Sequence, residues 1–70
     1  MKSNNFGKIL KELRTEKELS QKEFGEKLGF CNQSISFWES GRREPDFDTL
    51  ILISDFFGVS TDYLLGRKIY

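Results

Sequence analysis

The chain has 70 residues, with one cysteine and no histidine, and its 11 Lys and Arg residues balance 11 Asp and Glu residues. A disulfide within the chain is therefore excluded, and a metal site rich in His or Cys is not expected. No apolar run approaches the roughly 18 residues of a membrane span, and the polar N-terminus is unlike a signal peptide. A lone thiol suits a reducing compartment. We therefore expect a soluble, cytoplasmic protein of one domain, residues 1–70.

The charges are unevenly distributed along the chain. Residues 1–43 hold nine basic and six acidic residues, whereas residues 44–66 hold five acidic residues and no basic one. The first two-thirds of the chain is therefore basic and the last third mostly acidic. This polarity fits an ordinary solvated surface as well as a site for a polyanion.

Apolar spacing and helix-ending residues predict five short helices, at residues 6–17, 21–28, 32–40, 47–57 and 61–65. The first has the i, i+3, i+4, i+7 spacing of an amphipathic helix. The second begins at a capping box formed by Ser20 and Glu23 and ends at Gly29.

Gly41 ends the third helix, and Pro45 disfavours helix in the loop that follows. Asp46 and Ser60 are N-caps for the fourth and fifth helices. The predicted fold class is all-α, a compact five-helix bundle.

On a helical wheel, the third helix has two sides of different character. The side expected to be buried holds Cys31, Ile35 and Trp38. The other side has no charged residue and holds Asn32, Gln33, Ser36 and Phe37. Side-chain amides match the adenine edge in the DNA major groove, and a phenyl ring can contact a thymine methyl group. The pattern fits a DNA-reading face, and it fits equally a surface helix with one stray aromatic residue.

A capped helix, a glycine turn and a second helix form the helix-turn-helix pattern. Together with the segments LSQ, SISFWESG, GRREP and GVSTDYLLG, this pattern resembles the Cro/phage-repressor family of bacterial and phage DNA-binding domains, also called the xenobiotic-response-element type. The resemblance extends from Phe6 to Gly66. It implies a lambda-repressor-like domain that binds double-stranded DNA as a small transcriptional regulator.

The resemblance also implies roles for individual residues. Gln21, Arg42 and Arg43 would contact phosphates, and Ser34 would touch the DNA backbone or a thymine methyl group. The residues facing base edges would be Asn32, Gln33, Ser36 and Phe37. An ion pair between Arg14 and Glu39 would fix the third helix against the first.

Three positions depart from the family pattern. Gly25 replaces the usual alanine; it keeps the close approach between helices but costs about 1 kcal/mol in helix propensity. Cys31 replaces a Ser or Thr cap, and we expect it to be a small, partly buried substitute, with redox sensing as the alternative. Phe37 is large where a polar residue is more usual, so base preference there is not transferable from relatives.

Members of this family usually bind palindromic operators as dimers, so a homodimer is expected. Its surface is predicted to comprise Leu52, Phe56, Tyr63, Ile69 and Tyr70, unless the C-terminal residues fold back over them. The favoured activity is repression through the DNA-reading helix, with a protein-interaction module, such as an antitoxin or anti-repressor partner, as the alternative. No enzymatic activity, cofactor, metal or small-molecule ligand is expected, because no nucleophile–base pair and no Gly-rich phosphate loop is present.

Overall fold

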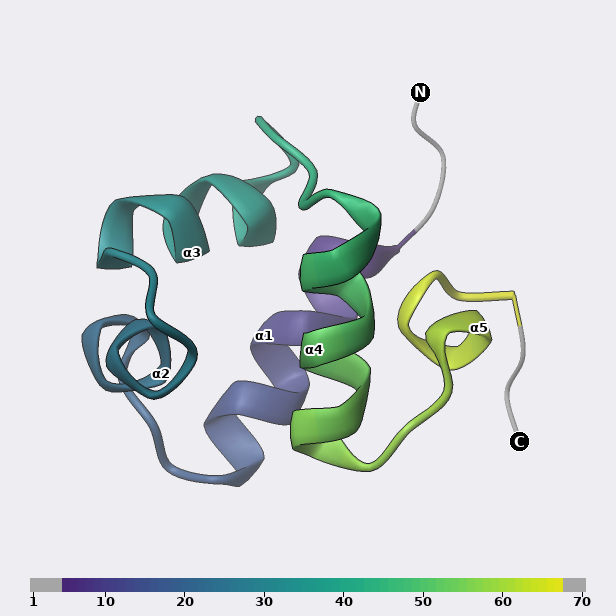
Figure 1. Cartoon of the computed structure of the whole chain (residues 1–70), viewed down its shortest axis with the longest axis horizontal. Coiled ribbons are helices and arrows are strands. Elements are labelled where there is room, and N and C mark those ends of the chain that lie inside the picture. Colours follow the sequence, from purple (N-terminus) through teal and green to yellow (C-terminus); the bar gives the residue numbers. More distant parts are fainter. Residues whose placement is uncertain (1–4, 68–70) are drawn as a thin grey trace.

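The computed structural model describes residues 5–67, which form five α-helices and no strand. The helices are α1 (Phe6–Glu16), α2 (Gln21–Leu28), α3 (Asn32–Ser40), α4 (Phe47–Phe57) and α5 (Thr61–Leu64). The predicted all-α, five-helix fold is confirmed. In Figure 1, α2 and α3 lie on one side of α1, and α5 lies on the other side of α4. Helices α1 and α5 each end one residue earlier than predicted, because Lys17 and Leu65 occupy the C-cap positions.

Local hydrogen bonds define where the helices begin. The Ser20 hydroxyl accepts from the Glu23 N–H at 3.0 Å, and the Glu23 carboxylate accepts from the Ser20 N–H at 2.8 Å, which completes the predicted capping box. Asp46 accepts from the Thr49 N–H at 2.8 Å, and the Ser60 hydroxyl accepts from the N–H three residues later at 3.0 Å. Helices α2, α4 and α5 therefore begin where the polar side chains indicated.

The turn between α1 and α2 is formed by a residue in an unusual conformation. Glu18 has φ +59°, and it is the one non-glycine residue with positive φ among residues 5–67. This left-handed conformation is costly for a side chain with a Cβ atom. It is held by two hydrogen bonds, from the Leu19 N–H to the Arg14 carbonyl at 3.2 Å and from Arg14 Nη1 to the Leu19 carbonyl at 2.7 Å.

The core is formed by one or two residues from each helix. Its buried members are Phe6, Leu10, Phe24, Ile35, Trp38, Ile53 and Leu64. Among the apolar residues of α4 only Ile53 is buried, and Leu50 and Phe57 are half-buried at the edge of the core. The core therefore joins all five helices, and it sets the position of α3 relative to α1 and α2.

An aromatic cluster corrects one of the predictions for α4. Phe56 was expected to point away from the core, but its ring lies 5.5 Å from that of Phe24 and 5.0 Å from that of Phe57, centroid to centroid. Phe24 and Phe57 are themselves 5.3 Å apart. The three rings meet because α2 approaches this side of α4, which the wheel of an isolated helix does not reveal.

None of the described helices has the length and apolar character needed to cross a membrane.

Candidate nucleic-acid interface

A bidentate ion pair joins the C-terminal end of α3 to α1. Arg14 Nε donates to Glu39 Oε2 at 2.6 Å, and Arg14 Nη2 donates to Glu39 Oε1 at 3.0 Å. Both side chains are largely buried, with 10% and 5% of their side-chain surface exposed. The Glu39 carboxylate, through this hydrogen bonding, raises the pKa of Arg14 above its ordinary value. The ion pair expected from the resemblance is thus present, and it fixes the orientation of α3.

Gln21 extends this ion pair to the start of α2. Its side-chain amide Nε2 donates to Glu39 Oε1 at 3.1 Å. The sequence suggested a phosphate contact for Gln21 but gave no sign of this second role. Because an amide group carries two N–H donors, one remains for another acceptor. Three helices therefore converge on a single carboxylate.

Two glycines allow close approach of the backbones that surround α3. A Cβ atom on Gly7 of α1 would lie 2.4 Å from the Glu39 carbonyl oxygen and 2.7 Å from that of Trp38. A Cβ atom on Gly25 of α2 would lie 2.4 Å from the Phe30 carbonyl oxygen. Gly25 therefore allows the close approach expected of it, here between α2 and the turn that follows, which leaves no room for a methyl group. Sequence reasoning missed Gly7, whose only signal was a glycine inside an amphipathic helix.

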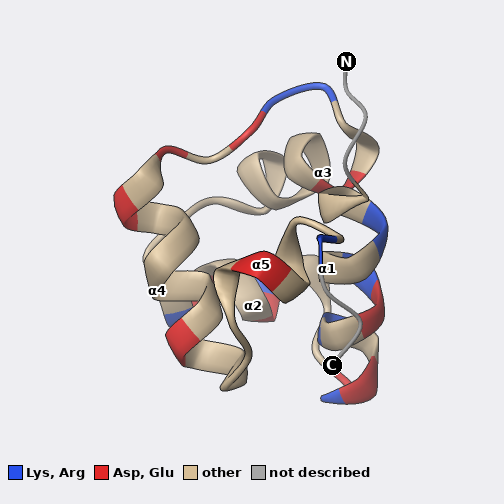
Figure 2. Cartoon of the chain, turned by 90° about the vertical axis from the view of Figure 1, so that its right-hand side faces the viewer, with Lys and Arg blue, Asp and Glu red and all other residues tan. Residues whose placement is uncertain are grey.

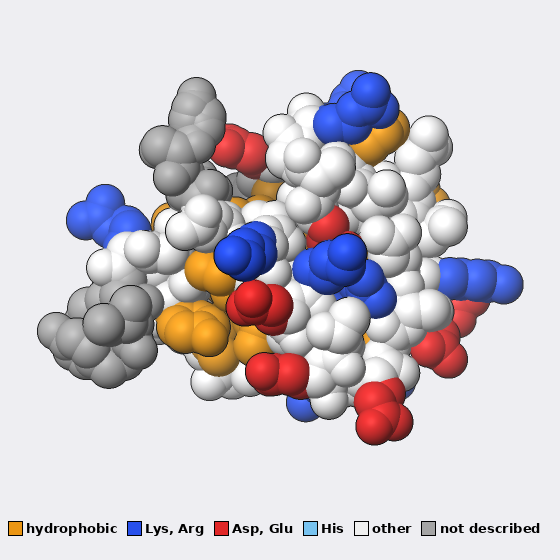
Figure 3. Space-filling view, turned by 180° about the vertical axis from the view of Figure 1, so that it is seen from behind, with side chains coloured by type: hydrophobic (Ala, Val, Ile, Leu, Met, Phe, Trp, Pro, Cys, Tyr) orange, Lys and Arg blue, Asp and Glu red, His pale blue; other side chains and the backbone are white. Residues whose placement is uncertain are grey.

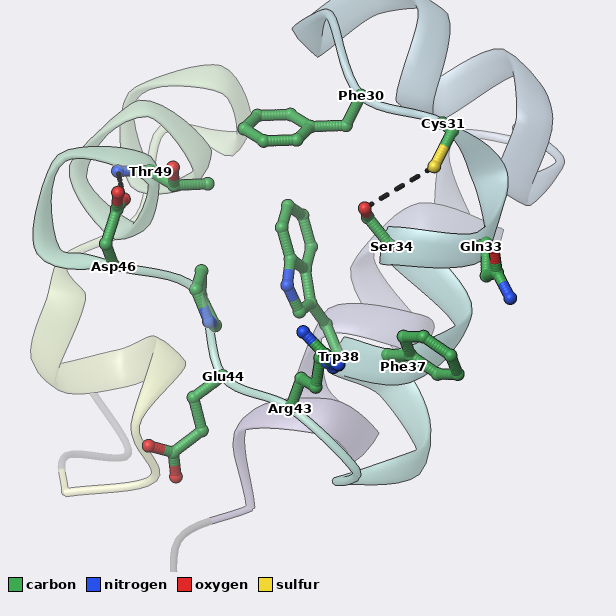
Figure 4. A pocket seen from close by; sticks show the side chains of 11 residues that line it. Phe30, Cys31, Gln33, Ser34, Phe37, Trp38, Arg43, Glu44, Asp46 and Thr49 are labelled. Carbon is green, nitrogen blue, oxygen red and sulfur yellow. Dashed lines mark hydrogen bonds between the residues drawn. The ribbon is translucent and has the colours of Figure 1, made fainter.

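The predicted reading face of α3 is accessible. Asn32 and Gln33 are exposed, and Ser36 and Phe37 are half-buried. In Figure 4 the Gln33 side chain projects away from the helix into open space. Ser34 points to the side of α3 that faces α4, toward Cys31. The amides thus lie on an open surface, as expected for groups that contact a partner molecule.

Cys31 corrects a second prediction, because it is exposed rather than partly buried. It is the N-cap of α3 with extended backbone angles, φ −77° and ψ 158°, so the helical wheel does not apply to it. Its side chain makes no capping hydrogen bond, and its Sγ lies 3.5 Å from Ser34 Oγ. Hydrogen bonding with the Ser34 hydroxyl lowers the pKa of the Cys31 thiol from its ordinary value.

Phe37 lies beneath the two arginines that follow α3. The guanidinium carbons of Arg42 and Arg43 are 5.8 Å and 5.5 Å from the centroid of its ring. Both distances fall within the range of cation–π interactions. This arrangement was not predicted, although an aromatic residue five and six positions before paired arginines, across a helix-ending glycine, was a usable signal.

A groove of about 400 Å³ separates α3 from the loop that leads into α4. Phe30 and Trp38 form its floor, with their rings 5.1 Å apart, and Arg43 and Glu44 lie at its rim (Figure 4). Among residues 5–67, no group of three His, Cys, Asp or Glu side chains could hold a metal ion.

Charge changes sign abruptly within the loop between α3 and α4. Figure 2 shows the loop basic next to α3 and acidic as it approaches α4, where Arg42 and Arg43 give way to Glu44 and Asp46. The face seen from behind in Figure 3 carries interspersed basic and acidic side chains. The charge polarity of the sequence is therefore visible at this loop, beside the reading face, and not as a uniform basic surface over the back of the molecule.

The exposed apolar residues of α4 differ from those predicted. Leu52 is 43% exposed, as anticipated, but Phe47 and Ile51 are more exposed, at 85% and 52%. Phe56 belongs to the aromatic cluster described above, and Tyr63 is half-buried. Ile69 and Tyr70 lie outside the described residues.

Known proteins resemble this chain over the same helices. A family model described as helix-turn-helix matches residues 10–64, which include all of α2, α3 and α4. This chain belongs to the helix-turn-helix family, and its resemblance to the Cro/phage-repressor type is confirmed. The helix-turn-helix chain is 48% identical over 63 residues to the transcriptional regulator ImmR of Bacillus subtilis, covering 90% of this chain and 50% of ImmR. It is 43% identical over 63 residues to the transcriptional activator BcrR of Enterococcus faecalis, covering 90% of this chain and 31% of BcrR.

Solved structures agree with the fold of this helix-turn-helix chain. The phage P22 c2 repressor, crystallised in complex with a synthetic operator, superposes with a TM-score of 0.85 at 29% identity, covering 94% of this chain and all of that one. A transcriptional regulator from Listeria innocua superposes with a TM-score of 0.86 at 25% identity, covering 99% of this chain and 66% of that one. The chain spans about half the length of the curated relatives ImmR and YqaE of Bacillus subtilis.

Proposed function

We propose that this chain binds double-stranded DNA in a sequence-specific manner, with α3 in the major groove, and regulates transcription as a repressor. The observation that carries the proposal is the open face of α3, where Asn32 and Gln33 present exposed amides and no charged residue intervenes. Amides of this kind pair with adenine edges. The start of α2, with the positive end of its dipole, meets α3 at Glu39, and Arg42 and Arg43 follow the same end of α3.

The flanking groups would position α3 on the DNA without reading sequence. Gln21 at the start of α2 keeps one amide N–H for a phosphate oxygen while the other holds Glu39. Arg42 and Arg43 are exposed, and no carboxylate lies within ion-pair distance of either in the described part of the chain. Phosphate contacts of this kind supply affinity and register, and base contacts supply sequence preference.

Three points support a binding protein over an enzyme. The P22 c2 repressor, which superposes closely, was crystallised with an operator. The relatives ImmR and BcrR are named as transcriptional regulators, and BcrR as an activator. The residues of the α3 face are hydrogen-bonding amides and hydroxyls without an acid, base or nucleophile arrangement suited to catalysis. We propose that this activity takes place in the cytoplasm.

The test is selection of bound sites from random DNA, followed by affinity measurements at several salt concentrations. Binding of the selected site should weaken steeply as salt rises. Gln33→Ala should lose about 1–3 kcal/mol of discrimination at one base position. Arg43→Ala should weaken binding to all sequences alike and thus serves as the contrasting variant. If Gln33→Ala keeps the full sequence preference, α3 does not read DNA through this face. If no sequence is enriched, the result favours a protein-interaction module over a sequence-specific DNA-binding protein.

We further propose that the chain acts as a homodimer through α4. The three large hydrophobic side chains that are well exposed among residues 5–67 are Phe47, Ile51 and Leu52, all on this helix. Grouped exposed apolar residues mark interfaces. Light scattering on an Ile51→Lys/Leu52→Lys variant should give the monomer mass, whereas Glu12→Lys, an exposed change on α1, should leave the dimer intact. A dimer that survives the double change would exclude this surface.

A further inference from the structure

The loop after α3 folds back onto the helix that precedes it. The Phe37 carbonyl accepts hydrogen bonds from the Arg42 N–H at 3.0 Å, the Arg43 N–H at 3.3 Å and the Ser40 hydroxyl at 3.2 Å. Gly41, with φ +82°, makes the reversal possible, because this left-handed conformation carries no penalty for glycine. One backbone group therefore anchors both arginines at the end of the reading helix.

The side chain of the same residue continues this arrangement. The Phe37 ring lies 5.8 Å from the guanidinium carbon of Arg42 and 5.5 Å from that of Arg43. Figure 4 shows the Arg43 side chain beside this ring, at the edge of the groove between α3 and α4. A ring that contacts two cations presents less of its face to a base. Contact with the ring also limits the rotation of the two guanidinium groups, which lie over a residue of the α3 reading face.

We propose that Phe37 is a positioning residue for Arg42 and Arg43, and not a reader of bases. The ring holds the two guanidinium groups in place before DNA arrives, so less side-chain freedom is lost when they contact phosphates. Phe37 therefore raises affinity for every DNA sequence, while sequence preference rests on Asn32, Gln33 and Ser36. The inference depends on the proposed DNA-binding function and assigns a role within it.

Affinity measurements on ring variants separate positioning from reading. Phe37→Leu keeps an apolar side chain but removes the ring, and Phe37→Tyr keeps the ring. We expect Phe37→Leu to weaken binding to the selected site, to each of its single-base variants and to unrelated DNA by the same factor, about two- to fivefold for each arginine released. Phe37→Tyr should retain the original affinity. A loss by Phe37→Leu that is confined to one base position would overturn the proposal and identify the ring as a base contact.

A double-mutant cycle tests whether the effect acts through the arginines. In an Arg42→Ala/Arg43→Ala background, Phe37→Leu should have no further effect on affinity. The same factor of loss in that background would overturn the proposal, because the ring would then act on DNA directly.

Nuclear magnetic resonance of the DNA-free protein provides a readout that does not depend on DNA. The side-chain δ protons of Arg42 and Arg43 should show upfield ring-current shifts that Phe37→Leu abolishes and Phe37→Tyr preserves. Backbone amide resonances that are unchanged away from Phe37 would show that both variants keep the fold. Shifts unchanged in Phe37→Leu would overturn the role of Phe37 alone. Failure of the unsubstituted chain to bind any DNA would overturn the proposed function, and this role of Phe37 with it.

Discussion

Replacing Glu39 by glutamine removes the charge at which α1, α2 and α3 converge while almost preserving the shape of the side chain. The carboxylate accepts three hydrogen bonds, two from Arg14 at 2.6 and 3.0 Å and one from Gln21 at 3.1 Å. A glutamine amide has a single oxygen, so its NH₂ group would face a donor of Arg14 or Gln21. The Arg14 charge, in a residue only 8% exposed, would then have no carboxylate partner at this site.

The size of the effect follows from these contacts. Losing one hydrogen bond to a charged group costs about 1.5–3 kcal/mol, and breaking a buried ion pair outright costs about 3–5 kcal/mol. Glutamine still accepts one bond from Arg14, so we expect Glu39→Gln to lower the free energy of unfolding by about 2–4 kcal/mol. A domain of this size has a free energy of unfolding of roughly 3.5–10 kcal/mol, so we expect the variant to remain folded with a smaller margin of stability.

Urea unfolding at neutral pH, followed by the fluorescence of buried Trp38, measures this loss. Glu12→Gln, which removes the same charge from an exposed position of α1, should change stability by no more than about 0.5 kcal/mol. Adding Arg14→Met to Glu39→Gln should cost less than the sum of the two single changes, because no unpaired charge then remains buried. A loss below about 1 kcal/mol for Glu39→Gln, with an unchanged m-value, would refute the reasoning.

Three further changes probe the local structure. Gly7→Ala should lower the free energy of unfolding by about 1–2 kcal/mol, because the clash with two carbonyl oxygens of α3 exceeds the gain in helix propensity; a higher melting temperature would contradict this. Cys31→Ser should raise the free energy of unfolding by about 0.5–1 kcal/mol, because serine supplies the missing capping hydrogen bond, and Cys31→Ala should not raise it. The N–H and hydroxyl of Ser20 hold the pKa of Glu23 below its ordinary value, and the hydroxyl and N–H of Thr49 do the same for Asp46. The unfolded chain therefore takes up protons at higher pH than the folded chain does, so the free energy of unfolding should decrease as the pH drops below about 4.5, and this decrease should be smaller in Glu23→Gln.

Most of the helix boundaries were predictable from the sequence, because each depends on a few neighbouring residues. The Ser20 and Asp46 caps and the left-handed glycines Gly29 and Gly41 act within one turn of the chain, and the structure contains them where they were expected. The open amide face of α3 was equally visible, since it follows from the spacing of residues along a single helix.

Properties that depend on the approach of two helices were not predictable in this way. Phe56 was assigned to the surface from the wheel of α4, yet it is half-buried in an aromatic cluster with Phe24 of α2. Cys31 was assigned to the buried side from the wheel of α3, yet it precedes the helix and is exposed. Phe47 and Ile51 are exposed on α4, where an apolar pattern alone would equally have placed them in a core.

The sequence by itself determined which side chains can form hydrogen bonds on α3 and where that helix begins and ends, because both are local properties of the chain. The tertiary structure alone decided which groups those side chains meet. Gln21 shares the Glu39 carboxylate because the start of α2 reaches the end of α3, and Gly7 is enclosed because α1 passes directly against the same helix end. Phe37 supports two arginines because the loop after Gly41 reverses onto it. Such contacts depend on the relative placement of segments in space, which spacing along one helix does not encode.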